Sequence, residues 1–179
     1  MAPDKNPCKV YLDTEFTNFE NPELLSIALC AEHGPELYLE LDLSQPGSNR
    51  TARRSSDFTR DVVLSQLGQI PGAAVGAKDI GTRIATWIQD LPAAQVVVVY
   101  DFQPDYDLLE RALRESAIGL EAIQKIVPAI GDSIWSEEGA SQRAEESWEK
   151  SETEWIFRHH ALADARALRA AAAGAMPNC

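Results

Sequence analysis

Apolar residues recur at two different spacings along this chain, and the spacing predicts which segments form strands and which form helices. Strands are expected at 8–16, at 23–32 and at 36–43, and in the third of these every second residue from 37 to 43 is leucine. Short turns join the three segments, which predicts an antiparallel meander. The alternation in the third strand predicts that it lies nearer an edge of the sheet than the first.

The middle of the chain continues with helices and one buried strand. The polar segment 44–56 is interpreted as a surface loop, and the helix after it is expected to begin at its cap Asp57 and to end near Gly68. A second helix is expected at 78–91. The segment 94–100 contains four consecutive valines, so it lacks a polar face and predicts a strand covered on both sides. Because this strand follows a helical crossover, it should lie parallel to an earlier strand.

The last third predicts two more helices and one short strand. A helix is expected from Pro104, a strand at 126–130, and an alanine-rich helix at 161–173. The acidic segment 136–155 is interpreted as a solvated loop or exposed helix, with a regulatory element as the alternative.

Together these elements predict one α/β domain over residues 1–179. Its sheet is expected to be mixed and five-stranded, with an antiparallel three-strand meander plus parallel strands, flanked by helices. Residues 1–7 and 175–179 are expected to be flexible tails.

Composition narrows the class of protein. With 45% hydrophobic and 25% charged residues, the chain has the balance of a soluble globular protein, and no apolar run is long enough to span a membrane. No signal peptide is recognisable, and Cys8, Cys30 and Cys179 lack metal-ligand spacing, so a cytoplasmic location is expected. The net charge of -12 disfavours non-specific adhesion to nucleic acid. An enzyme acting on nucleic acid would therefore need metal ions and a local basic patch.

Candidate chemistry starts at the end of the first strand. Asp13 and Glu15 are two residues apart, so on a strand both carboxylates project from the same face. Two like charges this close are stabilised by a cation, and oxygen ligands suit Mg²⁺ or Mn²⁺. Taken alone, the pair favours a solvated strand end over a metal site.

Two later segments carry more groups of the same kind. Residues 100–109 leave a predicted buried strand and enter a helix, and residues 159–164 begin the last helix. The titratable groups in the two segments are Asp101, Asp105, Asp107, His159, His160 and Asp164. Taken singly, an aspartate in the first turn of a helix is also favoured by the helix dipole, and His159 also fits a surface position.

Taken together, these motifs resemble those of the DEDDh 3′–5′ exonucleases, which have a ribonuclease H-like fold. The resemblance covers almost the whole chain and is nearest to the small bacterial exoribonucleases, the ribonuclease T and oligoribonuclease branch. The first motif is matched by Asp13 and Glu15, and the second by Asp105, four residues after Asp101.

The third motif is a histidine, four intervening residues and an aspartate, which His159 and Asp164 match. His160 is one residue too close to Asp164 and is expected to be a bystander. The sequence departs from the family at 100–101, where it has Tyr-Asp in place of the usual His-Asn. Asp107 is therefore a rival to Asp105, but it lies roughly 200° further around the helix, and the spacing favours Asp105.

The resemblance implies a specific chemistry. Asp13, Glu15, Asp105 and Asp164 would hold two divalent cations, Mg²⁺ or Mn²⁺, and His159 would act as general base. The reaction implied is hydrolysis of single-stranded RNA from the 3′ end with release of 5′ mononucleotides. The alternatives are a DNA-directed exonuclease with the same site and a non-catalytic nucleic-acid-binding module. Membership of the family also implies a homodimer.

Substrate contacts are predicted from residues near these motifs. Thr14, Phe16 and Phe19 adjoin the first carboxylates, and aromatic rings there suit stacking on a terminal base, although Phe16 equally fits a core position. The basic cluster is Arg50, Arg53, Arg54 and Arg60, which would guide the phosphate backbone or simply solubilise a loop. The segment before His159 is expected to be mobile until metal and substrate bind.

Overall fold

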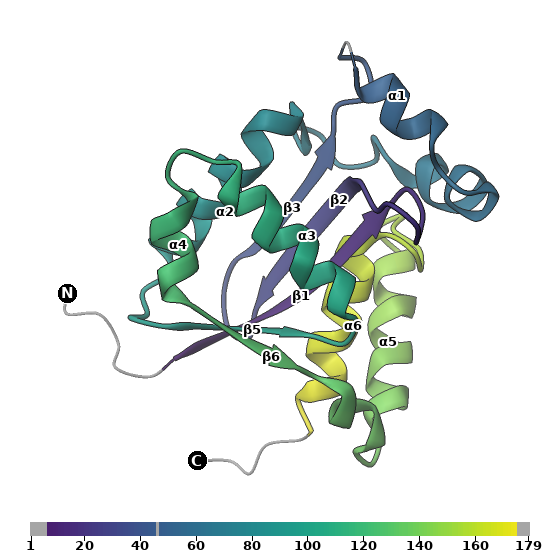
Figure 1. The fold of residues 1–179 in the computed structure, drawn as a ribbon. Helices are drawn as coiled ribbons and strands as arrows, with labels where there is room; N and C mark the ends of the chain where they lie inside the picture. Colours follow the sequence, from purple (N-terminus) through teal and green to yellow (C-terminus); the bar gives the residue numbers. More distant parts are fainter. Residues whose placement is uncertain (1–6, 46, 175–179) are drawn as a thin grey trace.

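A mixed six-stranded sheet with helices on both faces organises the molecule, in the strand order β4-β3-β2-β1-β5-β6 (Figure 1). The structure is a computed structural model that describes residues 7–45 and 47–174, so residues 1–6 and 175–179 of the predicted tails lie outside the described residues. The strands are β1 (Cys8–Phe16), β2 (Leu24–Ala31), β3 (Glu36–Leu41), β4 (Ala74–Val75), β5 (Val96–Tyr100) and β6 (Ile126–Ile130).

The helices alternate with the later strands along the chain. The α-helices are α1 (Ser48–Arg53), α2 (Ala77–Asp90), α3 (Gln103–Arg114), α4 (Gly119–Lys125), α5 (Ala140–Glu152) and α6 (Ala161–Ala172). Three shorter turns of other types are a π-helix at Thr59–Val63 and 3₁₀ helices at Leu64–Gln66 and Asp132–Ser136.

Strand pairing confirms the predicted mixed sheet. β1, β2 and β3 form the antiparallel meander, while β5 lies parallel to β1 and β6 parallel to β5. The prediction of five strands was wrong, because β4 pairs parallel with β3 and forms the sixth. β4 has only two residues and is closely flanked by glycines, so it is too short to show a period of two.

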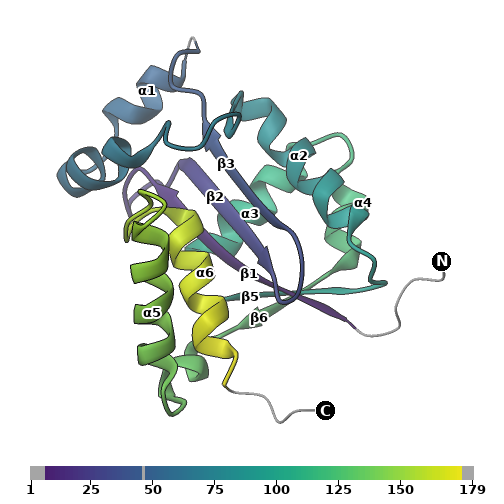
Figure 2. The same ribbon diagram turned by 180° about the vertical axis from the view of Figure 1, so that it is seen from behind.

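Each face of the sheet has its own core. On one face, Val10, Leu12 and Val98 pack against apolar residues of α2, α3 and α4. On the other face, Tyr11 and Val99 pack against alanines and leucines of α5 and α6, which are seen in front of the sheet in Figure 2. The valines of β5 are therefore covered from both sides, as their unbroken apolar run predicts.

The segment from 44 to 69 differs from its prediction. The expected surface loop contains α1, which is polar and has no apolar stripe that could have been recognised. The expected regular helix after Asp57 is instead the π-helix followed by a 3₁₀ turn. A π-helical turn holds more residues than an α-helical one, so the phase shifts: Val63 is buried, whereas Phe58 is exposed.

The C-terminal half agrees more closely with its pattern. The acidic segment forms α5, an exposed helix with Ala140, Ala144 and Ser151 buried. This agrees with its interpretation as an exposed helix. Among the described residues, no helix has both the length and the apolar character needed to cross a membrane. Cys8 and Cys30 are free thiols, and Cys179 lies outside the described residues.

Candidate active site

The site is built around the C-terminal end of β1. Tyr11 packs toward α5 and α6, and the period of two places Asp13 and Glu15 on that same face. The pairing with β2 shifts register between Glu15 and Phe16, so the regular ladder ends just after the second carboxylate. A break of this kind in the regular pairing changes the direction of the side chains beside it.

Asp105 reaches the same strand from α3. Its side chain is 2% exposed, and its Oδ1 accepts a hydrogen bond of 2.5 Å from the Thr14 hydroxyl. Pro104 occupies the first turn of α3 and fixes where the helix begins. The rival Asp107 is exposed and accepts a hydrogen bond of 2.8 Å from Gln103 instead. The structure therefore brings Asp105, and not Asp107, to the end of β1.

Asp164 and His159 come from the first turn of α6 and the loop before it. Asp164 accepts hydrogen bonds from the Trp148 indole at 2.6 Å and from the His159 backbone N–H at 2.9 Å. Ligand atoms of Glu15, His159 and Asp164 lie within 4.8 Å of one another. The His159 ring also meets Phe58 edge to face, with centroids 4.9 Å apart. Residues distant in sequence therefore converge on the carboxylates of β1.

All five predicted catalytic residues face one cavity. A cavity of about 620 Å³ is lined by Asp13, Glu15, Asp105, His159 and Asp164, together with several aromatic side chains. A second cavity of about 320 Å³ shares Asp13, His159 and Asp164 and is bounded by Trp135, Trp148 and Arg158. Asp13 and Asp164 therefore line both cavities, whereas Glu15 and Asp105 line only the larger one.

Burial and mutual repulsion raise the proton affinity of this cluster. Burial, with the charges of Asp164 and Asp105, raises the pKa of Glu15 to about 8. Burial likewise raises the pKa of Asp105 to about 7 against the opposing hydrogen bond from Thr14. The pKa of Asp13 is raised well above its usual range by burial and then by Asp105, and burial raises the pKa of Asp164. Such a group of carboxylates is unstable in its fully ionised form without a compensating charge.

The donor set fits a hard divalent cation. Among the described residues, Asp13 Oδ2 is enclosed and has no hydrogen-bond partner, which is costly for a carboxylate oxygen. Asp13, Glu15, Asp105 and Asp164 offer only oxygen ligands, the type that Mg²⁺ and Mn²⁺ prefer over softer metals. A cation beside Asp13 would compensate both the unpaired oxygen and the repulsion.

Asp101 is a fifth carboxylate that the sequence reasoning did not assign to the site. It lines both cavities, and its charge raises the pKa of Asp13 and of Asp105. The Trp135 indole donates a hydrogen bond of 2.9 Å to Asp101 Oδ2. The signal was present in the sequence, because this position departs from the family pattern by replacing a neutral amide with a charged group.

Phe102 was also missed. It stacks on Phe16 at a centroid distance of 6.4 Å and meets Phe19 edge to face at 6.1 Å. All three rings line the larger cavity, and Phe19 and Phe102 are 79% and 42% exposed. Phe16 is half-buried, so it serves both as a packing residue and as part of the cavity wall. An exposed aromatic directly after a strand-end aspartate was the available signal.

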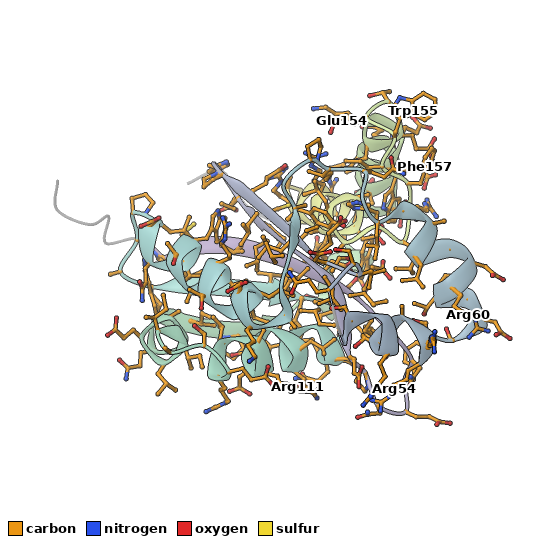
Figure 3. The ribbon with its side chains drawn as sticks, turned by 90° about the horizontal axis from the view of Figure 1, so that it is seen from above. Arg54, Arg60, Arg111, Glu154, Trp155 and Phe157 are labelled. Atoms are coloured by element: carbon orange, nitrogen blue, oxygen red, sulfur yellow. The ribbon has the colours of Figure 1, made fainter. Side chains whose placement is uncertain are left out.

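Three of the predicted substrate residues lie elsewhere or are otherwise engaged. The Thr14 hydroxyl is used to hold Asp105. Arg53 and Arg54 line neither cavity, and Arg54 is paired with Glu23 at 2.5 Å. Figure 3 shows Arg54 and Arg60 on the segment around α1 and the π-helix, away from Trp155 and Phe157 on the loop between α5 and α6.

His160 has a structural role, in line with its expected absence from the site. It is 2% exposed, its ring stacks on Tyr38 with centroids 4.5 Å apart, and its Nδ1 accepts a hydrogen bond of 3.2 Å from the Leu162 N–H. It therefore caps α6. Burial lowers the pKa of His160 to about 4, so the ring is neutral at neutral pH.

Comparison with known proteins adds no family: neither protein-family models nor curated proteins give a match to this sequence. The function is therefore inferred from the site and its chemistry.

Proposed function

We propose that this chain is a metal-dependent 3′–5′ exoribonuclease of the DEDDh type, on a ribonuclease H-like fold, that releases 5′ mononucleotides from single-stranded RNA. The observation that carries the proposal is the convergence of Asp13, Glu15, Asp105, Asp164 and His159 on one cavity, with an enclosed, unpaired oxygen on Asp13. These five residues stand at the motif positions of that family. The antiparallel meander followed by parallel strands is the sheet expected of it.

The four carboxylates supply the ligands for the metal centre. Asp13 and Glu15 contribute from β1, Asp105 from α3 and Asp164 from α6. Helices from both faces of the sheet therefore supply ligands at the end of β1. These carboxylates would hold two divalent cations, which would supply activation of a water molecule and stabilisation of the leaving 3′ oxygen. Thr14 and Trp148 each hold one carboxylate by a hydrogen bond, which fixes the ligand orientation.

His159 takes the proton from the attacking water. An imidazole is suited to this task at neutral pH, and its ring lies beside the carboxylates of Glu15 and Asp164. Asp164 also accepts the His159 backbone N–H at 2.9 Å, so one residue serves both as a ligand and as a support for the base.

The aromatic wall favours an unpaired strand. Phe16, Phe19 and Phe102 form a group of rings in mutual contact at the larger cavity. Bases in a single strand are free to stack on such rings, whereas bases in a duplex are already stacked on one another. Each stacked base contributes roughly 1–3 kcal/mol in comparable sites.

The test is a comparison of RNA and DNA of the same sequence, each 5′-labelled, with Mn²⁺ or Mg²⁺. The expected result is a ladder that shortens from the 3′ end of RNA and is abolished by EDTA and by Asp13→Asn. Faster shortening of DNA would replace RNA by DNA as substrate. Failure to cleave either polymer or a dinucleotide, together with the absence of saturable Mn²⁺ binding, would reject the enzyme in favour of a binding module.

A further inference from the structure

The loop that carries His159 has an unusual backbone. Residues 153–160 join α5 to α6, and within this loop Trp155 and His159 both have φ of 63°, in the left-handed region that non-glycine residues rarely adopt. Such a conformation persists only where surrounding contacts maintain it. Mobility of the segment before His159 until metal and substrate bind stays a prediction. α5 continues to Glu152, and hydrogen bonds join the loop after it to a residue distant in sequence.

That residue is Gln66, the last residue of the 3₁₀ helix after the π-helix. Its amide oxygen accepts a hydrogen bond of 3.1 Å from the Phe157 N–H. Its amide nitrogen donates to the carbonyl of Arg158 at 2.8 Å and to that of His159 at 3.2 Å. One side chain thus contacts three consecutive residues from more than ninety positions away in the sequence.

Both sides of His159 are consequently fixed. Its N–H is bonded to Asp164 and its carbonyl to Gln66. The ring itself is exposed and meets Phe58 edge to face, so the backbone hydrogen bonds on both sides of His159 contribute to where the imidazole points. Phe157 leaves its side chain exposed, and its backbone N–H is bonded to Gln66.

We propose that Gln66 is a positioning residue for the reaction: it anchors the α5–α6 loop in the conformation that directs His159 at the carboxylate cluster. This role rests on the proposed function, since it matters only where His159 acts as a base. A small misplacement of a catalytic group lowers a rate by about a hundredfold, so a side chain that fixes the loop affects turnover more than substrate affinity.

Only a primary amide supplies this set of contacts. It offers an acceptor to one N–H and a donor to two carbonyls at the same time. Glutamate at position 66 would have no donor and would direct a negative charge at both carbonyls. Methionine would match the length of the glutamine side chain but would form none of the three hydrogen bonds. Gln66→Met and Gln66→Glu should therefore both lower the rate of RNA hydrolysis. Because both side chains have nearly the length of glutamine, a loss of packing would not explain such a defect.

The experiment compares wild type, Gln66→Met and Gln66→Glu, with Gln142→Met as the matched control. Gln142 is a surface glutamine of α5 whose amide, among the described residues, bonds only to Glu146, at 3.0 Å. For each protein, kcat and KM on 5′-labelled single-stranded RNA are measured with Mn²⁺. The rate of trypsin cleavage after Arg158 in the folded protein gives a readout that does not depend on activity.

The expected result is a fall in kcat of about 10- to 100-fold for both Gln66 variants, with KM changed by less than about twofold. Cleavage after Arg158 should accelerate in both, and Gln142→Met should match wild type in every measurement. Faster cleavage with unchanged kcat would reduce Gln66 to a structural role and overturn the inference. An inactive wild type would overturn the proposed function itself, a result distinguishable from an active wild type whose Gln66 variants are equally active.

Discussion

Two adjacent histidines in this molecule have opposite surroundings. His159 is exposed at the cavity, whereas His160 is enclosed between Tyr38 and the first turn of α6. We expect His159→Asn, which tolerates the left-handed backbone, to abolish RNA cleavage and to shift Tm by less than about 2 °C. We expect His160→Ala to lower stability by about 2–4 kcal/mol, because a cap bond and a buried ring are lost together.

Thermal unfolding of both variants, beside their cleavage rates, tests this assignment. The stability that neutral His160 provides should also fall as pH drops from 6.5 toward 4, because the unfolded state then binds a proton that the folded state resists. A His160→Ala protein as stable as wild type would contradict the structural role.

The charge on Asp101 is a second feature of this site with a measurable effect. It adds a negative charge beside Asp13 and Asp105, and its Trp135 contact requires only an acceptor. Asp101→Asn preserves the shape and removes the charge, so Mn²⁺ affinity should fall by about tenfold. Calorimetric titration with Mn²⁺ measures this. Asp132→Asn, an exposed neighbour of Trp135 on the same 3₁₀ helix, is the control. Unchanged affinity in Asp101→Asn would exclude Asp101 from the metal site.

At the scale of elements, α1 and the turns after it carry a cluster of four basic side chains, Arg50, Arg53, Arg54 and Arg60. Arg54 is neutralised by Glu23 and Arg60 by Asp57, whereas Arg53 is exposed and has no ion-pair partner among the described residues. The four arginines that looked equivalent in the sequence are therefore distinct. Arg50 is likewise exposed and has no ion-pair partner among the described residues, so Arg50 and Arg53 are the two of the four whose charges are available for a phosphate.

Arg53→Ala should raise KM on long single strands, leave a dinucleotide unaffected, and reduce the slope of log KM against log salt by about 0.7, as expected for one lost phosphate contact. Arg54→Ala loses an exposed ion pair worth about 0–1 kcal/mol and should change the salt slope less. KM measured between low and moderate salt on both lengths of substrate decides this. Equal effects of Arg53→Ala on long and short substrates would show that α1 solubilises the protein and does not guide RNA.

At the scale of the molecule, the carboxylate cluster makes folding depend on pH. Glu15 and Asp105 have folded pKa values raised to about 8 and about 7, so the folded state binds more protons than the unfolded chain. The stability from their protonated forms is lost as pH rises through those values. Between pH 6.5 and 8.5, where His160 is neutral in the folded state and contributes less than about 0.5 kcal/mol of pH dependence through the unfolded chain, EDTA-treated protein should lose about 2–3 kcal/mol, or about 5–10 °C in Tm.

Saturating Mn²⁺ should reverse most of that loss in Tm at pH 8.5. At pH 6.5 it should raise Tm much less, because cation and proton compete for the same oxygens. Glu15→Gln should flatten the metal-free profile. A metal-free wild type whose Tm is constant or rises across this range would show that the cluster is not strained in its ionised form.

The sequence predicted those parts of the fold and site that depend on local periodicity. The alternation in β3, the valines of β5 and the two-residue spacing of Asp13 and Glu15 each determine a face, and Asp105 was separated from Asp107 by its angle on the helix. β4 was not predicted because two residues are too few to show a period. Gln66 escaped because a lone glutamine carries no motif and its partners are more than ninety residues away. The prediction of which residues in 57–69 are buried was wrong because a π-helical turn breaks the 3.6-residue repeat.

The central claim is that the carboxylates gathered at the end of β1 perform the hydrolysis, and the pair Asp105 and Asp107 tests it within one helix. The measurement is the initial rate of 3′ shortening of 5′-labelled single-stranded RNA with Mn²⁺ by wild type, Asp105→Asn and Asp107→Asn. Loss of an outer-shell partner already costs 10- to 100-fold, so Asp105→Asn should lose at least about a hundredfold. Asp107→Asn, which alters only an exposed contact with Gln103, should stay within about twofold of wild type. An active Asp105→Asn, or an Asp107→Asn as inactive as Asp105→Asn, would contradict the account.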